Sequence, residues 1–370
     1  MPEAKGPAGK PAREHTRRVR VGGVSVGGGS PIAVQSMTSV AMRRTEEGPV
    51  LDAAGNLEQI ARLADAGCEI VRVAVSNAAS VEPFARVCAR SPLPVVADIH
   101  FDHRLAVAAA RAGAAALRIN PGNIGSWDRV DEVIDAAASC GIPIRVGVNT
   151  GSLDERWKSR EDLTVPERLC GSAVEFAEHF ARRGFDDVVI SAKASDVVCM
   201  MQTYRLISRA LPQVPLHLGV TESGTLLPGA VKSAVGIGCL LEEGIGDTFR
   251  VSLTDDPVAE VEVAWEILAS CGLRVHGPRL VSCPTCGRCQ TDMIPVAREV
   301  ERRLGGVKTP LTVAVMGCEV NGPGEAADAD VGVACGRDSG VIFAQGRPLR
   351  RVGVERIVEE LFAEIEKLES

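Results

Sequence analysis

The sequence predicts an α/β protein, in which an amino-terminal (β/α)8 barrel is followed by a small carboxy-terminal α+β domain. Eight short runs rich in Val and Ile recur between residues 31 and 253, and segments of helical period separate them. Strands of a parallel sheet are buried on both faces and read as such near-continuous apolar runs. With 370 residues, 45% of them hydrophobic, the chain is long enough for a large core and a second domain. A doubly wound open sheet is the alternative fold.

The strands and helices of the barrel alternate in chain order. Strands are predicted over residues 31–37, 69–75, 93–100, 115–122, 142–151, 187–195, 215–224 and 247–253. Helices are predicted over residues 56–68, 104–113, 129–141 and 173–184, several of which end in Gly, as helices often do. The segment "VGGVSVGGGSP" at residues 21–31 predicts a Gly-rich hairpin at the bottom of the barrel, because it lacks the Lys-Ser/Thr ending of a phosphate loop.

We divide the chain into three parts. Residues 1–20 are basic, rich in Pro, Gly and Ala, and contain no apolar run, so we expect a flexible arm and not a signal peptide. Residues 21–270 form the predicted barrel. Residues 271–370 change to short strands and turns and end in an amphipathic helix over residues 353–368, which indicates the small α+β domain.

The composition excludes several classes of partner. A net charge of -7, from 41 basic and 48 acidic residues, argues against general binding to DNA or to an anionic membrane. Aromatic residues make up 3% of the chain, too few for stacking on single-stranded nucleic acid. Twelve cysteines in a long chain without a recognisable export signal predict reduced thiols and a cytoplasmic location.

Five of the predicted strands contain a cation, which is costly inside a parallel sheet unless the charge meets a partner. These residues are Arg72, Arg118, Arg145, Lys193 and Arg250. Active sites of (β/α)8 barrels lie at the carboxyl ends of the strands, so we expect the cations to converge there on a ligand with two phosphates. The alternative is that nearby carboxylates such as Asp98 or Glu222 neutralise each of them.

Polar residues follow the same strands and extend the predicted site. They are Asp98, His100, Asn120, Asn123, Asn149, Thr221, Glu222 and Ser252. Asn and Ser side chains can orient phosphate or hydroxyl oxygens, and an acid among cations can transfer protons.

A cluster of cysteines opens the second domain. "CPTCGRC" contains Cys283, Cys286 and Cys289, and Cys318 follows in "MGCEVNGPGE". Two cysteines separated by two residues can wrap one metal ion or one corner of an iron–sulfur cluster. Zinc ribbons usually have two such pairs, so one pair and a later single cysteine favour the cluster. Spacing alone ranks Cys289 above Glu325 as the fourth ligand.

The motifs together resemble one enzyme family. They are "VQSMT", "DIHFD", "RINPGNIG", "RVGVNTGSLD", "SAKASD", "HLGVTESG", "EGIGDTFRVSLTDDP", "SCPTCGR" and "MGCEVNGPGE". In this order they closely resemble the 4-hydroxy-3-methylbut-2-enyl diphosphate synthases of the non-mevalonate isoprenoid pathway, from about Thr16 to the carboxyl terminus. The resemblance implies a TIM-type barrel and a 4Fe-4S cluster held by Cys283, Cys286, Cys318 and Glu325, with Cys289 as a neighbour that is not a ligand. A carboxylate ligand is displaced more easily than a thiolate.

The resemblance also implies a reaction. Two single electrons from reduced flavodoxin or ferredoxin open the ring of 2-C-methyl-D-erythritol 2,4-cyclodiphosphate, a hydroxyl leaves as water, and 4-hydroxy-3-methylbut-2-enyl diphosphate forms. Glu222 and Glu325 are the implied catalytic residues, with Glu222 handling the proton. The implied substrate contacts are Arg72, Arg118, Arg145, Asn149, Lys193, Thr221, Arg250 and Ser252. The family further implies a homodimer with a composite active site.

One segment departs from the family pattern, and two other functions stay open. Residues 39–56 form a longer connection after "VQSMT" than the resemblance leads us to expect. One alternative function is a non-catalytic zinc module with Cys283, Cys286, Cys289 and Cys318 as ligands. The other is a barrel enzyme that acts on a different phosphorylated substrate and has a purely structural cluster.

Overall fold

The computed structural model describes residues 12–46, 48–289, 291–318 and 328–369. The chain divides into two compact units, Met1–Arg274 and Val275–Ser370. In the described part of the chain, no helix is long and apolar enough to cross a membrane.

The first unit is a closed parallel barrel, as the sequence predicts. Its strands are β3 (Ala33–Met37), β6 (Ile70–Ala74), β7 (Val95–Ile99), β8 (Ala116–Ile119), β9 (Ile144–Asn149), β10 (Val188–Lys193), β11 (His217–Leu218) and β12 (Thr248–Phe249). The hydrogen-bonded order is β10-β9-β8-β7-β6-β3-β12-β11, and a parallel bridge from Leu216 to Ile190 brings β11 back to β10. The alternative of an open doubly wound sheet is therefore wrong.

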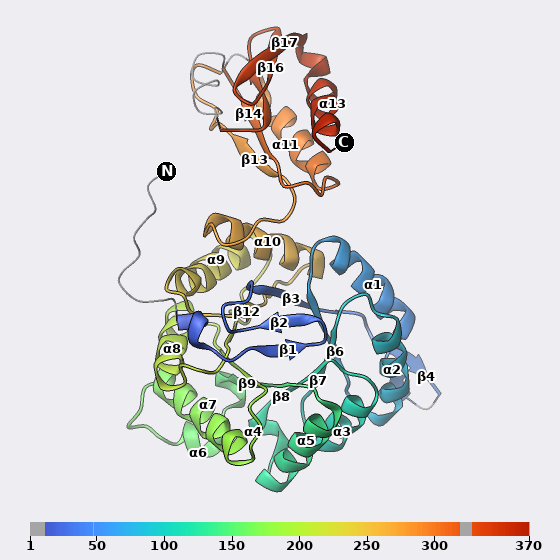
Figure 1. Cartoon of the computed structure of the whole chain (residues 1–370), viewed down its shortest axis with the longest axis vertical. Coiled ribbons are helices and arrows are strands. Elements are labelled where there is room, and N and C mark those ends of the chain that lie inside the picture. The colour runs from blue at the N-terminus through green and yellow to red at the C-terminus, as the bar shows by residue number, and fades with distance from the viewer. Residues whose placement is uncertain (1–11, 47, 290, 319–327, 370) are drawn as a thin grey trace. The chain divides into compact units, whose positions relative to one another are not determined.

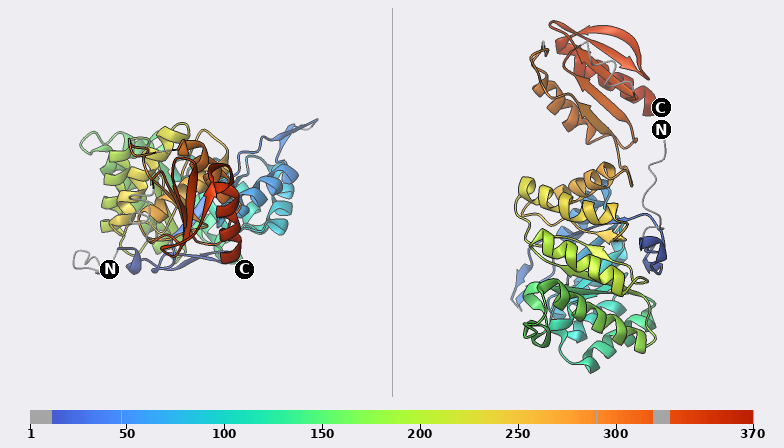
Figure 2. Two further views of the ribbon diagram at one scale, coloured as in Figure 1. Left: turned by 90° about the horizontal axis from the view of Figure 1, so that it is seen from above. Right: turned by 90° about the vertical axis from the view of Figure 1, so that its left-hand side faces the viewer.

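Helices surround the strands (Figure 1 and Figure 2). They are α1 (Ala53–Asp65), α2 (Val81–Arg90), α3 (His103–Arg111), α5 (Trp127–Cys140), α7 (Val165–Arg182), α8 (Val197–Ala210), α9 (Leu226–Glu242) and α10 (Pro257–Ser270), with the short α4 (Pro121–Ile124) and α6 (Glu155–Lys158). Asp52, Asp102, Asp196 and Asp256 begin four of these helices by accepting hydrogen bonds from backbone N–H groups of the first turn. Each cap fixes where the loop after a strand ends.

A Gly-rich hairpin covers the amino-terminal end of the barrel. Strands β1 (Val19–Val21) and β2 (Val24–Val26) pair in antiparallel fashion and lie across the ring of strands in Figure 1. Val21 and Val26 pack in one buried cluster with Ile70, Val96 and Val189 of the barrel strands. The predicted position of this hairpin is confirmed.

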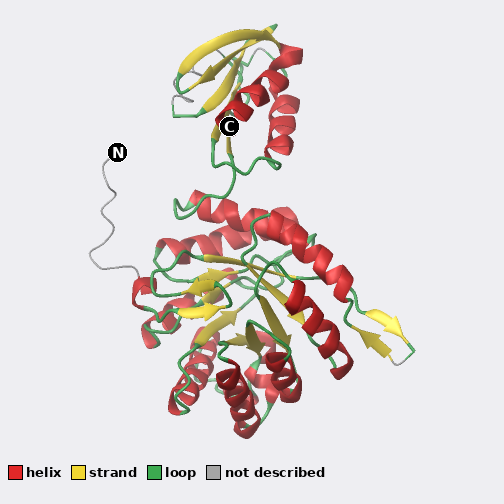
Figure 3. Cartoon of the chain, turned by 45° about the vertical axis from the view of Figure 1, so that its right-hand side comes forward, coloured by secondary structure: helices red, strands yellow, loops and turns green. Residues whose placement is uncertain are grey.

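The long connection over residues 39–56 contains a second hairpin. Strands β4 (Arg43–Thr45) and β5 (Gly48–Val50) pair in antiparallel fashion and project beside the barrel in Figure 3. All three residues of β4 are exposed. The hairpin is anchored at its base, where Asn77 Nδ2 donates a hydrogen bond of 2.8 Å to the carbonyl of Pro49.

The second unit is a two-layer α+β domain. A mixed sheet has the order β13 (Arg279–Ser282), β14 (Thr312–Met316), β15 (Val331–Cys335), β16 (Ser339–Ala344) and β17 (Arg347–Gly353). The first three strands are parallel and the last two pair in antiparallel fashion. Helices α11 (Met293–Leu304) and α13 (Ile357–Glu369) pack in one core with Val313, Val333 and Ile342 of the sheet.

Candidate active site

Five cations from five strands gather inside the barrel. Arg72 of β6, Arg118 of β8, Arg145 of β9 and Lys193 of β10 are at most 9% exposed, and Arg250 directly follows β12. Burial, and then the charges of the four arginines, hold the pKa of Lys193 well below its usual range. Arg145 differs from the expected position, since it is the second residue of β9 and its side chain starts near the amino-terminal end of the strand.

Asp98 of β7 pairs with two of these arginines. Its Oδ1 accepts a hydrogen bond of 3.1 Å from Arg118 Nη1, while its Oδ2 lies 3.8 Å from Arg72 Nε and 3.1 Å from His100 Nε2. Burial favours the protonated form of this carboxyl, but Arg72, His100 and Arg118 together hold its pKa well below the usual range. Asp98 is therefore a carboxylate at neutral pH. Burial also lowers the pKa of Arg72, to about 10.

Arg250 has a carboxylate partner that the sequence patterns did not reveal. Glu260 of α10 is 2% exposed and accepts hydrogen bonds from Arg250 Nη2 at 2.8 Å and Nε at 3.0 Å. Ser36 Oγ donates to the same carboxylate at 3.1 Å. This two-pronged contact fixes the plane of the guanidinium. An acid on the buried stripe of a mostly apolar helix was the available signal.

Arg145 and Lys193 have no carboxylate within 4.0 Å in the described ranges. Burial, more than the neighbouring cations, holds the pKa of both residues well below the usual range. The five cations thus share two carboxylate partners among the described residues, Asp98 and Glu260. An anionic ligand in the barrel would stabilise the charged forms of the other side chains.

Two glycines make room for these cations. A methyl group at Gly147 of β9 would lie 2.7 Å from Arg118 Nε and 2.8 Å from its Nη2. A methyl group at Gly219, directly after β11, would lie 2.5 Å from Lys193 Nζ. Because real Cβ atoms do not approach other atoms so closely, any larger residue at either position must displace the cation.

The predicted polar residues lie where the strands end. Asn149 and Lys193 end neighbouring strands and are partners in register. Thr221 is half-buried, and its N–H donates to the carbonyl of Ala194 at 3.1 Å. Glu222 is exposed and has a φ of 53°, a conformation that is uncommon outside glycine and that clusters at functional sites. The carbonyl of Ser252 accepts a hydrogen bond from Ser223 Oγ.

In the second unit, two of the clustered cysteines lie beside Gly317, the residue before Cys318. A methyl group at Gly317 would lie 2.8 Å from Cys289 Sγ and 3.3 Å from Cys283 Sγ. The N–H of Gly317 donates a hydrogen bond of 3.1 Å to Cys283 Sγ. Burial, and then the neighbouring thiols of Cys289 and Cys283, raise the pKa of Cys335 to about 12.

The chemistry of these thiols fits an iron–sulfur cluster. Cys286 is exposed, and the backbone N–H of Arg288 lowers the pKa of its thiol toward the thiolate form that binds metals. In iron–sulfur proteins, backbone hydrogen bonds to sulfur tune the reduction potential, and the Gly317 N–H makes a bond of this kind to Cys283. Among the residues that the structure describes, which include Cys283, Cys286 and Cys318, no three Cys, His, Asp or Glu side chains lie close enough together to hold a metal ion. Glu325, the predicted fourth ligand, lies outside the described residues.

Two further buried polar residues were missing from the predicted site. Gln35 of β3 is 5% exposed and His217 of β11 is fully buried, and both line a cavity with Arg145. A polar residue inside a buried strand was the available signal for each, because such a side chain requires a hydrogen-bond partner.

Comparisons with known proteins agree with the motifs. Family models match the chain as the GcpE TIM-barrel domain over residues 16–265 and as the GcpE protein C-terminal domain over residues 279–367. The 4-hydroxy-3-methylbut-2-en-1-yl diphosphate synthase (flavodoxin) of Maridesulfovibrio salexigens is 50% identical over 355 residues, covering 96% of this chain and 97% of that protein. Proteins of the same name from Geobacter sulfurreducens and Aquifex aeolicus are 49% and 47% identical, covering 95% and 96% of this chain and 98% of each relative. The chain therefore belongs to the GcpE family, in agreement with the resemblance of its motifs.

Proposed function

We propose that this chain converts 2-C-methyl-D-erythritol 2,4-cyclodiphosphate into 4-hydroxy-3-methylbut-2-enyl diphosphate. The observation that carries the proposal is the charge of the barrel interior, where five cations share two carboxylate partners among the described residues. A cyclic diphosphate offers two phosphates to the remaining positive charge. Relatives that are about half identical over nearly their whole length, and are named for this synthase activity, support the same function.

The residues of the barrel divide between binding and support. We assign the phosphate contacts to the five cations, Arg72, Arg118, Arg145, Lys193 and Arg250. We assign to Asn149, which ends β9, and to Thr221 and Ser252, which follow β11 and β12, the orientation of phosphate and hydroxyl oxygens. Asp98 and Glu260 hold three of the arginines in place through their ion pairs.

Glu222 is the proposed proton-transferring residue. The reaction takes up two electrons and one proton, opens the ring and releases the hydroxyl as water. The exposed carboxyl of Glu222 lies in the loop after β11, next to Thr221 of the proposed substrate site, and is assigned to pass a proton to the leaving hydroxyl.

We assign a 4Fe-4S cluster to Cys283, Cys286, Cys318 and Glu325, which makes Glu325 a catalytic residue through the cluster. When bound, this group supplies electrons one at a time to the substrate. Cys289 lies beside Cys283 but is not assigned as a ligand. The Gly317 N–H donates a hydrogen bond to the sulfur of Cys283 and so helps to orient this side chain.

The proposed partners follow from the electron requirement. The names of the relatives support flavodoxin as the electron donor, and reduced ferredoxin is the alternative donor. We also propose a homodimer, in which the second unit of one subunit completes the barrel site of the other, and a cytoplasmic location, where thiols remain reduced.

The test is metal analysis followed by turnover. Protein purified without oxygen should contain about four irons and matching sulfide per chain. Glu325→Ala should weaken or alter the cluster, whereas Cys289→Ala, a change to a neighbouring thiol, should retain it. With reduced flavodoxin, the wild-type protein should convert the cyclodiphosphate. A colourless protein with stoichiometric zinc that is lost in Cys289→Ala would contradict the proposal.

A further inference from the structure

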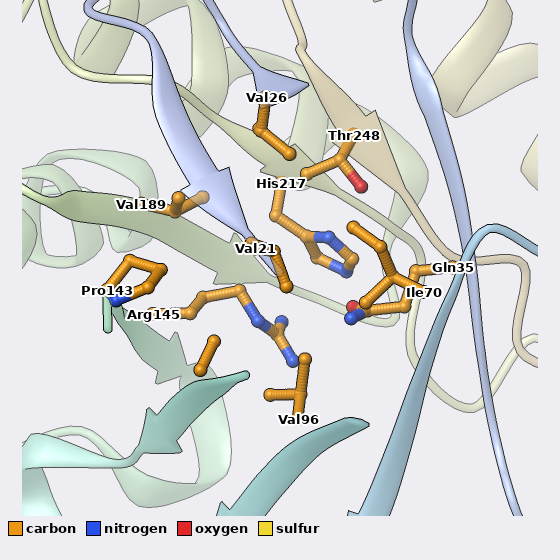
Figure 4. A pocket seen from close by; sticks show the side chains of 11 residues that line it. Val21, Val26, Gln35, Ile70, Val96, Pro143, Arg145, Val189, His217 and Thr248 are labelled. Atoms are coloured by element: carbon orange, nitrogen blue, oxygen red, sulfur yellow. The ribbon is translucent and has the colours of Figure 1, made fainter. Parts of the chain in front are cut away.

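An enclosed cavity lies inside the barrel, between the β1–β2 hairpin and the barrel strands. Its volume is about 20 Å³, which is room for a single water molecule. Arg145 of β9, His217 of β11 and Gln35 of β3 line it, and Figure 4 shows their side chains turned toward one another from three strands. Apolar residues, among them Val21 and Val26 of the hairpin, form the rest of the wall.

The polar atoms that face this cavity have no hydrogen-bond partner among the described residues. They are Arg145 Nε and Nη2, both ring nitrogens of His217, and Gln35 Oε1. These side chains are 6%, 0% and 5% exposed, so bulk water does not satisfy them. Buried polar atoms without partners are rare in proteins, and an ordered water commonly accounts for them.

One water molecule can satisfy part of this set of five atoms, since a buried water makes two to four hydrogen bonds. Arg145 can only donate, and Gln35 Oε1 can only accept. Burial, followed by the charges of Arg145 and Lys193, holds the pKa of His217 well below its usual range, so its neutral ring offers one donor and one acceptor. A water can accept from Arg145 and donate to both Gln35 and His217. A chloride ion would satisfy Arg145 but would face the Gln35 oxygen.

We infer that this cavity binds one water that links His217 and Gln35 to Arg145, and that His217 and Gln35 are positioning residues for Arg145. Because these partners are neutral, they fix the guanidinium without cancelling its charge. Arg118 and Arg250, in contrast, are fixed by the carboxylates of Asp98 and Glu260. The consequence for substrate binding rests on the proposed function, in which Arg145 contacts a phosphate.

The first test is structural and independent of the substrate. A crystal structure of the full chain, with ordered waters visible, should show one water within about 3.2 Å of Arg145 and of His217 or Gln35. Crystals soaked in bromide should show no anomalous peak in the cavity. A cavity without an ordered water, or a bromide peak in it, would overturn the inference. This outcome does not depend on which substrate the enzyme binds.

The second test measures binding of the cyclodiphosphate to the oxidised holoenzyme by calorimetry, without an electron donor. His217→Leu and the isosteric Gln35→Met should each weaken binding about tenfold, the effect of losing a hydrogen bond to a charged group. His217→Gln should restore most of the affinity, because it again offers a donor and an acceptor. Ile70→Val, which enlarges the same cavity without removing a polar atom, should bind like the wild type.

A double-mutant cycle distinguishes the positioning of Arg145 by His217 from a general loss of native structure in the variant. If His217 acts through Arg145, His217→Leu should change binding little once Arg145→Ala is present. Full additivity, or unchanged binding in both His217→Leu and Gln35→Met, would refute the positioning role. A wild-type protein that does not bind the cyclodiphosphate would instead refute the proposed function, while the crystallographic test of the water still stands.

Discussion

Small residues decide where the cations of the barrel lie. Lys and Arg side chains are long, and their heads need space inside a ring of packed strands. Gly147 provides this space for Arg118, and Gly219 provides it for Lys193. The glycines of "RVGVN" and "HLGV" are therefore part of the site, although they carry no functional group.

Gly147→Ala should displace the guanidinium of Arg118 from Asp98. Because the added methyl meets only the Arg118 side chain within 3.1 Å, the free energy of unfolding should fall by about 1–3 kcal/mol, as for other overpacked cores. Binding of the cyclodiphosphate should weaken by about tenfold, since one phosphate contact is misplaced. Chemical denaturation and calorimetry measure the two effects.

The matched control is Gly23→Ala. This glycine has no positive φ, and a methyl group there would have no heavy atom within 4 Å. Equal losses of stability in both variants would show that replacing a glycine as such, and not the contact with Arg118, causes the effect.

The sequence revealed the cations of the site better than their partners. Arg72 and Arg118 were conspicuous because a charge inside an apolar strand is costly. Glu260 was less conspicuous, because an acid on the apolar stripe of a helix is a weaker signal, and only tertiary packing shows that this acid meets Arg250. His217 carried the signal of a polar residue inside a buried strand, but its role depends on its place beside Arg145 of β9 and Gln35 of β3, which only the packed barrel shows.

At the scale of elements, Asp247 fastens the amino-terminal segment to the barrel. Its Oδ1 accepts a hydrogen bond of 2.9 Å from Thr16 Oγ1, and its Oδ2 accepts one of 2.8 Å from the N–H of Leu216. Thr16 Oγ1 in turn accepts from the N–H of Gly28 at the end of the hairpin. Burial raises the pKa of Asp247 to about 6.

This raised pKa predicts a pH dependence of stability. The folded protein binds the proton of Asp247 more tightly than the unfolded chain, whose carboxyl has a pKa of 3.8. Protonation of Asp247 therefore stabilises the folded state. This stabilisation is fully present below about pH 3.8 and is lost as the pH rises through about 6. Between these limits, the wild-type free energy of unfolding should fall relative to Asp247→Asn by on the order of 3 kcal/mol.

The measurement is denaturant unfolding of both proteins from pH 4 to pH 7. If the free energies of unfolding of the two proteins changed with pH in parallel, Asp247 would have its ordinary pKa in the folded state, and burial would not govern its charge.

The barrel strands were predictable and the β4–β5 hairpin was not. Parallel strands are buried on both faces, so their sequences are nearly continuous apolar runs. In β4, by contrast, Arg43, Arg44 and Thr45 are all exposed, and no alternation of apolar residues marks them as a strand. Pairing with β5, a few residues away, is what makes this segment extended.

At the scale of the whole molecule, each of the two units has a large hydrophobic core of its own. Strands and helices of the barrel bury one large cluster that includes Phe84, Leu117 and Tyr204. The second unit buries its own cluster, which includes Val300, Val333 and Leu361. Two cores of this kind allow two cooperative unfolding transitions, each of which responds to the ligands of its own unit.

Scanning calorimetry of the full chain should therefore resolve two transitions that move independently. In protein whose cluster has been removed, so that the second unit offers no cluster to the substrate, the cyclodiphosphate at 100 times its Kd should stabilise the barrel by about 2.7 kcal/mol and raise one melting temperature. Removing iron with a chelator should lower the other, because cluster ligands are far apart in the unfolded sequence. Gly147→Ala identifies the barrel transition, and Gly317→Ala, whose methyl would meet Cys289 and Cys283, identifies the second. If both transitions shifted together under either treatment, the two units would have to unfold as one body, and the separate cores would not control stability.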